Sequence, residues 1–138
     1  MEPEHRLVAR SLERAWEQAP AIDANISLSV DASATAVGAV LHQYINNTLQ
    51  PLAFFSKKLQ KSETRYSTYD RELLGIYLAV KHFKYHLEWR DFYINTDHKP
   101  IIYEFQQKPE NSSLRQLRHL LYIAQFTTDI RQKTWCRK

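Results

Sequence analysis

"YINTDHKP", residues 93–100, places Asp97 directly behind a run that alternates like a buried β-strand, and then interrupts the chain at Pro100. The earlier stretch "ISLSVDASATAVGAVL", residues 26–41, has the same form, because alternating apolar residues lead into Asp31 and then into small residues. Two strands that each end in an aspartate predict a pair of carboxylates lying side by side on one sheet.

The composition is that of a globular domain, and its charge is compatible with a polyanionic partner. The chain has 138 residues, which is enough for one domain with a core. The net charge of +4 favours nucleic acid only weakly, since many proteins with neutral ligands are equally basic. With only two glycines, Gly38 and Gly75, a glycine-rich phosphate-binding loop is excluded.

Three features predict an intracellular protein that is not secreted. The single Cys136 cannot form an internal disulfide, which fits a reducing compartment. The opening residues "MEPEHRLVAR" carry charges of both signs and show no apolar signal-peptide region. The longest apolar stretch, residues 73–80, is too short to span a bilayer.

The strand pattern predicts an antiparallel meander followed by strands reached through helical crossovers. Strands are expected at residues 26–31, 36–45, 49–59, 91–97 and 126–135, with turn residues at 46–48. Because a helix separates the fourth strand from the third, the fourth strand should run parallel to an earlier one. We therefore expect a mixed α/β sheet with helices against its faces.

Four helices are predicted from apolar spacing. They cover residues 6–19, 66–90, 98–105 and 109–125. The longest begins at Ser67 or Thr68 and carries an apolar stripe of Leu73, Ile76, Tyr77, Val80, Phe83 and Leu87. The last begins at Ser112 or Ser113 and carries a stripe of Leu114, Leu117, Leu121 and Ala124.

Asp31, Asp97 and Glu72 form a candidate metal site. Two carboxylates on neighbouring strands repel each other unless a cation lies between them, and Mg²⁺ prefers a few carboxylates together with waters and phosphate oxygens. Glu72 lies in the first turn of the crossover helix and is placed to join them. In the alternative reading, the two aspartates only start turns and Glu72 only interacts with the helix dipole.

Long stretches of the sequence resemble one known family. They are "SVDASATAVGAVLHQ" (29–43), the run from "PLAFFSKKL" to "TDHKPIIY" (51–103), and "LRQLRHLLYIAQFTTDIR" (114–131). All three are similar to the ribonuclease H domain of gypsy-type long-terminal-repeat retrotransposon polyproteins, which follows the reverse transcriptase polymerase. The resemblance divides the chain into a tether from the polymerase (1–25), a ribonuclease H-like domain (26–131) and a divergent tail (132–138).

The resemblance implies a five-stranded mixed sheet with helices on both faces, and an endonuclease that hydrolyses the RNA strand of RNA–DNA hybrids. Asp31, Glu72 and Asp97 match the family's catalytic and metal-binding carboxylates. The implied cofactors are two Mg²⁺ ions roughly 3.5–4 Å apart, with Mn²⁺ as a substitute. The implied setting is cytoplasmic, within a virus-like particle, or nuclear.

Further polar residues are candidates for contact with the hybrid, each with a structural alternative. The nucleic-acid-binding candidates are Ser33, Lys57, Lys58, Lys61, Arg65, His98, Arg115 and Arg118. A basic run such as residues 57–65 is more often a solvated face, and His98 is more often a turn residue. Asp70 is two positions from Glu72 and is expected to point away from the site as a capping or dipole carboxylate.

The end of the sequence departs from the family. After "FTTDIR" the family continues with a turn and a helix that carries a fourth metal carboxylate, whereas this sequence reads "QKTWCRK". We therefore expect the last family helix and the fourth ligand to be missing, with Asp129 in mid-strand as no clear substitute. Two functions follow: a metal-dependent ribonuclease, weakened by the missing fourth carboxylate, or a catalytically impaired module that only binds nucleic acid or protein.

Overall fold

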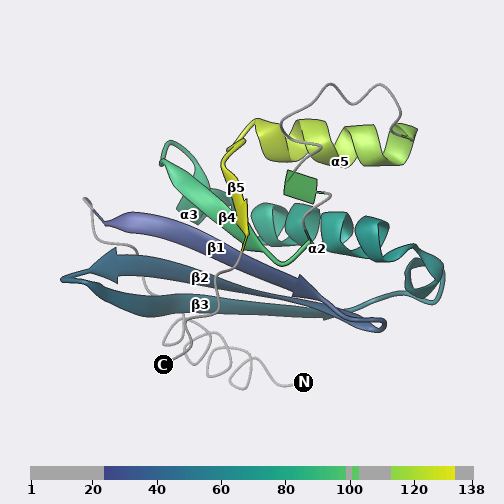
Figure 1. The fold of residues 1–138 in the computed structure, drawn as a ribbon, viewed down its shortest axis with the longest axis horizontal. Coiled ribbons are helices and arrows are strands. Elements are labelled where there is room, and N and C mark those ends of the chain that lie inside the picture. Colours follow the sequence, from purple (N-terminus) through teal and green to yellow (C-terminus); the bar gives the residue numbers. More distant parts are fainter. Residues whose placement is uncertain (1–23, 99–100, 103–112, 133–138) are drawn as a thin grey trace, which may run out of the picture.

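A single five-stranded sheet organises the protein, and the computed structural model describes residues 24–98, 101–102 and 113–132 of it (Figure 1). The strands are β1 (Asn25–Ala32), β2 (Ala36–Ile45), β3 (Thr48–Lys58), β4 (Phe92–Thr96) and β5 (Ile130–Gln132). Their order across the sheet is β3-β2-β1-β4-β5. The first three strands are antiparallel, and β4 and β5 are parallel to β1 and β4, so the predicted mixed sheet is confirmed.

Local sequence explains the hairpin between β2 and β3. Asn46 and Asn47 have positive φ angles of 52° and 60°, the conformation that a tight hairpin turn requires and that asparagine tolerates. Pro51 lies in the edge strand β3, where a missing N–H is least harmful. The register between β2 and β3 shifts between Leu41 and His42, next to this proline.

The described helices are η1 (Glu63–Arg65, a 3₁₀ turn), α2 (Thr68–His82), α3 (Lys84–Leu87) and α5 (Leu114–Ala124). The prediction of one continuous helix over residues 66–90 is wrong, because the helix breaks at Phe83, whose φ and ψ are −94° and 16°. Phe83 and Leu87 are nonetheless buried as expected. Apolar spacing identified the buried side, but it did not reveal the change of direction between α2 and α3.

Serine hydroxyls begin both longer helices. Ser67 Oγ accepts a hydrogen bond from the backbone N–H of Asp70 at 3.1 Å and caps α2. At α5, Ser113 Oγ accepts from Gln116 N–H at 3.2 Å while Gln116 Oε1 accepts from Ser113 N–H at 3.0 Å. This reciprocal capping box satisfies two N–H groups at the start of α5. Of the alternatives predicted, Ser67 and Ser113 are the caps.

The main core lies between the sheet and α2. Inward-facing apolar residues of β1, β2 and β4 pack against α2, α3 and α5 in one cluster that includes Leu28, Leu41, Ile76, Phe83 and Ile94. The described helices lie over the same face of the sheet (Figure 1). The resemblance also implies helices on the opposite face, and this expectation concerns residues outside those described.

Gly75 allows α2 to approach the sheet closely. A Cβ atom at this position would lie 3.3 Å from Cγ1 of Val30 on β1 and 3.3 Å from Cγ1 of Val37 on β2. Such contacts are tight for carbon atoms, so a side chain here would press the helix away from the strands. Gly75 therefore sets how near α2, and with it Glu72, lies to the end of β1.

The apolar stripe expected on α5 is only partly right. Leu114 and Leu121 are 66% and 57% exposed, whereas Leu120 and Ile123 are the buried side chains of this helix. The rotation of α5 is set by its contacts with α2, and these turn Leu120 and Ile123 towards the core. The expected strand over 126–135 is also shorter, because β5 begins only at Ile130.

Several expectations lie outside the described residues. They include the helix over 6–19, most of the helix over 98–105 (of which Ile101 and Ile102 are described and helical), and the tail beyond residue 132. The expected absence of the last family helix also concerns residues outside those described. No helix among the described residues is long and apolar enough to cross a membrane.

Candidate active site

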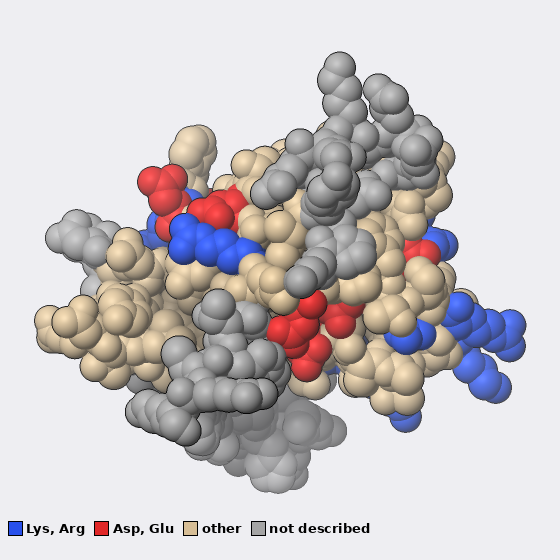
Figure 2. Space-filling view, in the orientation of Figure 1, with Lys and Arg blue, Asp and Glu red and all other residues tan. Residues whose placement is uncertain are grey.

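Asp31 and Asp97 lie at the same end of neighbouring strands. The parallel register of β1 and β4 pairs Ser29 with Asn95, and continuing it by two residues brings Asp31 level with Asp97. Adjacent strands are about 4.8 Å apart, so the two backbones are near neighbours at this edge. Both aspartates are exposed. Figure 2 shows acidic side chains grouped near the middle of one face, over the ends of β1 and β4.

Glu72 reaches the same edge from the first two turns of α2. Its Oε1 accepts a hydrogen bond from the backbone N–H of Ala32, the residue after Asp31, at 3.3 Å. The Glu72 residue is only 6% exposed, which is unusual for a glutamate. The close packing at Gly75, three residues further along α2, keeps this carboxylate against the end of β1.

The three predicted carboxylates therefore share one corner of the fold, but their side chains do not enclose a site. Within residues 24–98, 101–102 and 113–132, no group of three or more His, Cys, Asp or Glu side chains is arranged to hold a metal ion. The donor set itself, three carboxylates with two of them open to solvent, has the hard oxygen chemistry that Mg²⁺ prefers. The residues thus fit a divalent cation by type and by backbone position.

His98 is packed beside this corner. Its backbone N–H donates to Thr96 Oγ1 at 3.2 Å, and its ring lies 5.9 Å from the Tyr69 ring, centroid to centroid. The Nε2 atom is buried and has no hydrogen-bond partner among the described residues. Burial lowers the pKa of His98, because desolvation disfavours the charged imidazolium. The side chain is thus half-buried and favours its neutral form.

The predicted basic run lies next to the carboxylates across the sheet. Asp31 pairs with Gly38 on β2, and Gly38 pairs with Ser56 on β3, so two strand spacings of about 4.8 Å separate Asp31 from the end of β3. Lys57 and Lys58 end β3, Lys61 lies in the turn that follows, and Arg65 ends η1. All four side chains are exposed. Lys and Arg side chains gather at this end of the molecule in Figure 2.

Ser33 lies in the turn between β1 and β2. Its hydroxyl donates to Ala36 O at 3.2 Å and accepts from the N–H groups of Thr35 and Ala36 at 3.3 and 3.1 Å. These contacts shape the turn that follows Asp31. Ser33 is exposed, but its hydroxyl already donates its hydrogen to Ala36 O. A hydrogen bond to a phosphate would therefore have to replace this local contact.

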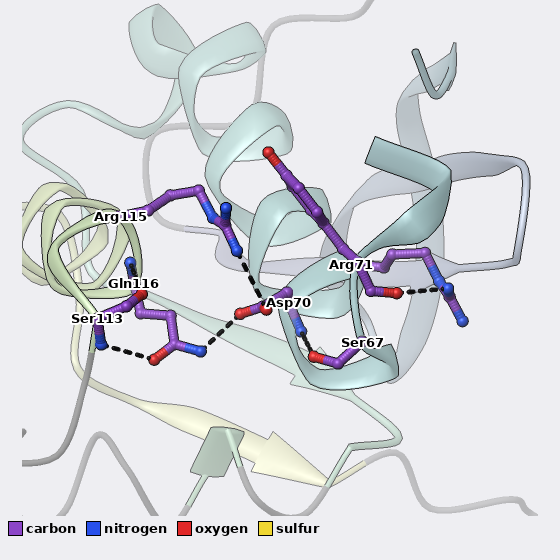
Figure 3. Close-up of polar contacts among 7 residues, drawn as sticks. Ser67, Asp70, Arg71, Ser113, Arg115 and Gln116 are labelled. Atoms are coloured by element: carbon purple, nitrogen blue, oxygen red, sulfur yellow. Dashed lines mark hydrogen bonds and ion pairs between the residues drawn. The ribbon is translucent and has the colours of Figure 1, made fainter. Parts of the chain in front are cut away.

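Asp70 links α2 to α5, a role that sequence analysis did not predict (Figure 3). Arg115 Nη2 and Gln116 Nε2 donate to the two carboxylate oxygens of Asp70 at 3.2 and 2.6 Å. The Arg115 guanidinium also lies 4.0 Å from the centroid of the Tyr66 ring. Asp70 is thus engaged with α5, consistent with the expectation that it does not belong to the carboxylate site. Arg118, one turn further, is exposed.

Asp129 is not in mid-strand as expected but directly precedes β5. Because Ile130 pairs with Ile94, Asp129 lies level with Tyr93, four residues before Asp97 on the neighbouring strand. At about 3.3 Å per residue this is roughly 13 Å from the carboxylate corner. Asp129 is paired with Arg131 Nη2 at 2.9 Å and does not replace a fourth ligand.

Sequence comparison, together with this fold and these carboxylates, identifies the family to which the chain belongs. The family described as "RNase H-like domain found in reverse transcriptase" matches residues 21–126, which include Asp31, Glu72 and Asp97. The chain belongs to this family. The match spans β1 to the end of α5 and thus covers the whole corner described above.

Curated relatives are retrotransposon polyproteins. The chain is 34% identical over 112 residues to the Retrovirus-related Pol polyprotein from transposon 412 of Drosophila melanogaster, covering 81% of this chain and 9% of that protein. It is 35% identical over 108 residues to the Transposon Tf2-3 polyprotein of Schizosaccharomyces pombe, covering 76% of this chain and 8% of that protein. The chain thus spans less than a tenth of these relatives.

Solved structures share the fold at low sequence identity. A foamy viral protease-reverse transcriptase in complex with RNA/DNA hybrid superposes with a TM-score of 0.63 at 11% identity, covering 100% of this chain and 20% of that one. RNase H1 from the archaeon Halobacterium salinarum NRC-1 gives a TM-score of 0.57 at 13% identity, covering 82% and 86%. At such identities the likeness establishes a ribonuclease H-like fold.

Proposed function

We propose that this domain is the ribonuclease H of a gypsy-type long-terminal-repeat retrotransposon, and that it cuts the RNA strand of RNA–DNA hybrids during reverse transcription. Its membership of the family of RNase H-like domains found in reverse transcriptase and its similarity to retrotransposon polyproteins support this proposal. Its partners would be the hybrid and the polymerase domain of the same polyprotein. It would act inside the cell, in a cytoplasmic virus-like particle or in the nucleus.

The observation that carries the proposal is the meeting of Asp31, Glu72 and Asp97 at one edge of the sheet. The strand register brings the two aspartates level, and the hydrogen bond from Ala32 N–H fixes Glu72 beside them. Solvent-exposed aspartates next to a buried glutamate form an open, negatively charged corner. Such a corner repels a phosphodiester unless cations neutralise it, so the proposal requires divalent metal.

Asp31, Glu72 and Asp97 would together hold the divalent metal through their carboxylate oxygens. When bound, two divalent ions supply an activated water and stabilise the leaving 3′ oxygen of the scissile phosphate. The chain contributes orientation: Glu72 is fixed by Ala32, whereas Asp31 and Asp97 point into solvent and are accessible to substrate. Mg²⁺ is the expected cofactor, with Mn²⁺ as a substitute.

The basic end of the molecule is proposed to hold the hybrid. Lys57, Lys58, Lys61 and Arg65 flank the carboxylate corner and are exposed. Contacts to phosphates from such residues give affinity without sequence preference and weaken as salt concentration rises. Ser33 and His98 follow Asp31 and Asp97 by two residues and one residue, and both are secondary candidates. Arg118, exposed on α5, is another. Arg115 is the weakest candidate, because Asp70 and the Tyr66 ring already engage it.

A second function is favoured by one observation. The three carboxylate side chains are not grouped tightly enough to hold a metal ion within the described residues. A domain in this state would bind the hybrid through its basic end without cutting it. Substitution of the three carboxylates would then leave binding of the hybrid unchanged.

A paired assay separates the two functions. The 138-residue chain is incubated with an RNA–DNA hybrid labelled on the RNA strand, in Mg²⁺ and in EDTA, and cleavage and binding are measured on the same samples. The ribonuclease proposal expects internal cleavage of the RNA strand in Mg²⁺ and none in EDTA. Binding without cleavage in either Mg²⁺ or Mn²⁺ would establish the second function instead.

A further inference from the structure

Tyr69 lies on α2 beside the carboxylate corner and is not among the proposed metal ligands or hybrid contacts. It is the second residue of α2, and Glu72 follows it by three positions, so the two side chains leave the helix on the same side. Tyr69 is partly buried and packs against the main core cluster. Its ring lies 5.9 Å from the ring of His98, centroid to centroid, with the two planes inclined at 54°. This contact joins α2 to the residue that follows Asp97.

A local hydrogen bond fixes the backbone on the other side of this contact. The His98 N–H donates to Thr96 Oγ1 at 3.2 Å, and Thr96 is fully buried. A hydroxyl that accepts from the second N–H along the chain closes a turn, and Asp97 lies at the centre of this one. The His98 Nε2 atom is buried without a hydrogen-bond partner among the described residues, so no hydrogen bond to this atom directs the ring. Packing against Tyr69 therefore holds the His98 ring, and with it the turn at Asp97.

The beginning of α2 is thus attached to the ends of both strands that carry the aspartates. At the end of β1, the Ala32 N–H donates to Glu72 Oε1 at 3.3 Å. After the end of β4, His98 contacts Tyr69. Mg²⁺ binds its oxygen ligands at about 2.0–2.1 Å in near-ideal octahedral geometry, so a small change in the spacing of two carboxylates weakens their hold on a shared ion. Both attachments of α2 therefore act on the spacing that matters for metal binding.

We propose that Tyr69 is a positioning residue for the metal site. Through its contact with His98, it holds the turn at Asp97 at a fixed distance from Glu72. This inference rests on the proposed function, since it concerns the carboxylates that would hold the divalent ion. Tyr69 acts through its neighbours and touches neither the ion nor the hybrid. Without its ring, the turn at Asp97 would shift relative to α2, and the carboxylates would be worse placed for one ion.

Tyr122 on α5 separates this role from ordinary packing. Like Tyr69, it is a partly buried tyrosine that packs against the main core cluster. Its ring contacts are with Tyr77 and Phe126, at 5.1 and 5.4 Å between centroids, and neither residue is next to a proposed metal ligand. Loss of either tyrosine ring should reduce stability, but only the loss of Tyr69 should also weaken metal binding. Tyr122 is thus the matched control.

Calorimetric titration of the whole 138-residue chain with Mn²⁺ tests the proposal, because it measures metal affinity without requiring cleavage. Tyr69→Leu keeps an apolar side chain but removes the ring, and it should weaken Mn²⁺ binding about 10–100-fold, the usual effect of losing a group that orients a metal ligand. Tyr69→Phe retains the ring and should bind Mn²⁺ as the unchanged chain does. Tyr122→Leu should lower the melting temperature as Tyr69→Leu does and leave the Mn²⁺ affinity unchanged. His98→Leu removes the other ring of the contact and should weaken Mn²⁺ binding as Tyr69→Leu does.

Normal Mn²⁺ affinity in a folded Tyr69→Leu chain would overturn the positioning role, and the proposed function would stand if the unchanged chain binds Mn²⁺ and cuts the hybrid. An equal loss of affinity in Tyr122→Leu would also overturn it, since the effect would then follow from stability alone. If Tyr69→Leu does not fold, His98→Leu decides in its place, and normal Mn²⁺ binding by that chain would overturn the proposal. An unchanged chain that neither binds Mn²⁺ nor cuts the hybrid would overturn the proposed function and the positioning role together.

Discussion

Glu72 and Ala32 are joined by a hydrogen bond across 40 residues of sequence, from the Ala32 N–H to Glu72 Oε1 at 3.3 Å. This contact attaches the beginning of α2 to the end of β1, one residue beyond Asp31. It makes the position of a buried carboxylate depend on the sheet rather than on helix geometry alone. The proposed catalytic corner is thus built into the packing of α2 on the sheet.

Divalent metal should stabilise the folded chain. A ligand that binds only the native state raises the free energy of unfolding, by about 2.7 kcal/mol at a concentration one hundred times its dissociation constant. We expect Mg²⁺ or Mn²⁺ to raise the melting temperature, and Asp31→Asn to reduce this rise, since it removes one proposed ligand. An equal rise in both chains would show that the metal binds elsewhere.

Asp70→Asn should destabilise the protein while leaving the carboxylate corner in place. The substitution weakens the contacts of Asp70 with Arg115 and Gln116 that attach α5 to α2. Hydrogen bonds to a charged group contribute about 1.5–3 kcal/mol, and we expect about 1–2 kcal/mol here because Arg115 is partly exposed to screening by solvent. Chemical denaturation measures the loss.

Asp129→Asn provides the control for Asp70. It weakens an ion pair of similar length, from Asp129 to Arg131 at 2.9 Å, whose side chains are 50% and 56% exposed and which joins no helices. We expect no measurable change in unfolding. If both variants lost the same stability, the link between α2 and α5 would have no special role.

Gly75→Val should destabilise the protein by about 1–3 kcal/mol, the usual cost of overpacking a core. The new side chain would meet Val30 and Val37, whose Cγ1 atoms already lie 3.3 Å from the position of a Cβ. Gly38→Ala is the control, because its Cβ would meet nothing closer than 3.9 Å. Comparable losses in the two variants would contradict the close approach of α2 to the sheet.

Stability should decrease in mild acid, partly through His119. Burial and the nearby Arg115 lower the pKa of His119, although Asp70 opposes this, and its ring stacks on Tyr77 at 4.4 Å. Because the folded-state pKa is below the unfolded value near 6.5, the unfolded chain binds more protons as pH falls through this range. The contribution of neutral His119 to the free energy of unfolding is therefore fully present above about pH 6.5 and is lost as the pH falls below that value.

Melting temperatures at pH 7.5 and 5.5 measure this effect. His119→Phe retains an aromatic ring against Tyr77 but cannot titrate, so its melting temperature should fall less between the two pH values than that of the unchanged chain. Lys81, whose Nζ lies 5.8 Å from the Tyr77 ring, is present in both chains and cancels from the comparison. A steeper fall in His119→Phe would contradict the sign of the pKa shift.

The sheet was largely predictable from sequence because its signals are local. Alternating apolar residues predicted β1 and β2, the asparagine pair predicted the turn after Ile45, and the intervening helix predicted that β4 runs parallel to an earlier strand. The strand register then brings Asp31 and Asp97 level, as two strands ending in aspartate had suggested. Each of these inferences needs only a few adjacent residues.

The helices were less predictable because their ends and rotations depend on distant contacts. The break at Phe83 keeps both Phe83 and Leu87 buried, so apolar spacing is equally compatible with one helix or two. On α5, the link from Asp70 to Gln116 accompanies a rotation that buries Leu120 and exposes Leu121. No local pattern indicates a partner 46 residues away.

Asp97 and Asp91 offer the most direct test of the central claim, because they flank β4 at its two ends and are both exposed. Cleavage of a labelled RNA–DNA hybrid in Mg²⁺ is compared for the unchanged chain, Asp97→Asn and Asp91→Asn, with folding checked by circular dichroism. The account predicts that Asp97→Asn is folded and inactive while Asp91→Asn cuts at the normal rate. Normal cleavage by a folded Asp97→Asn chain would contradict it.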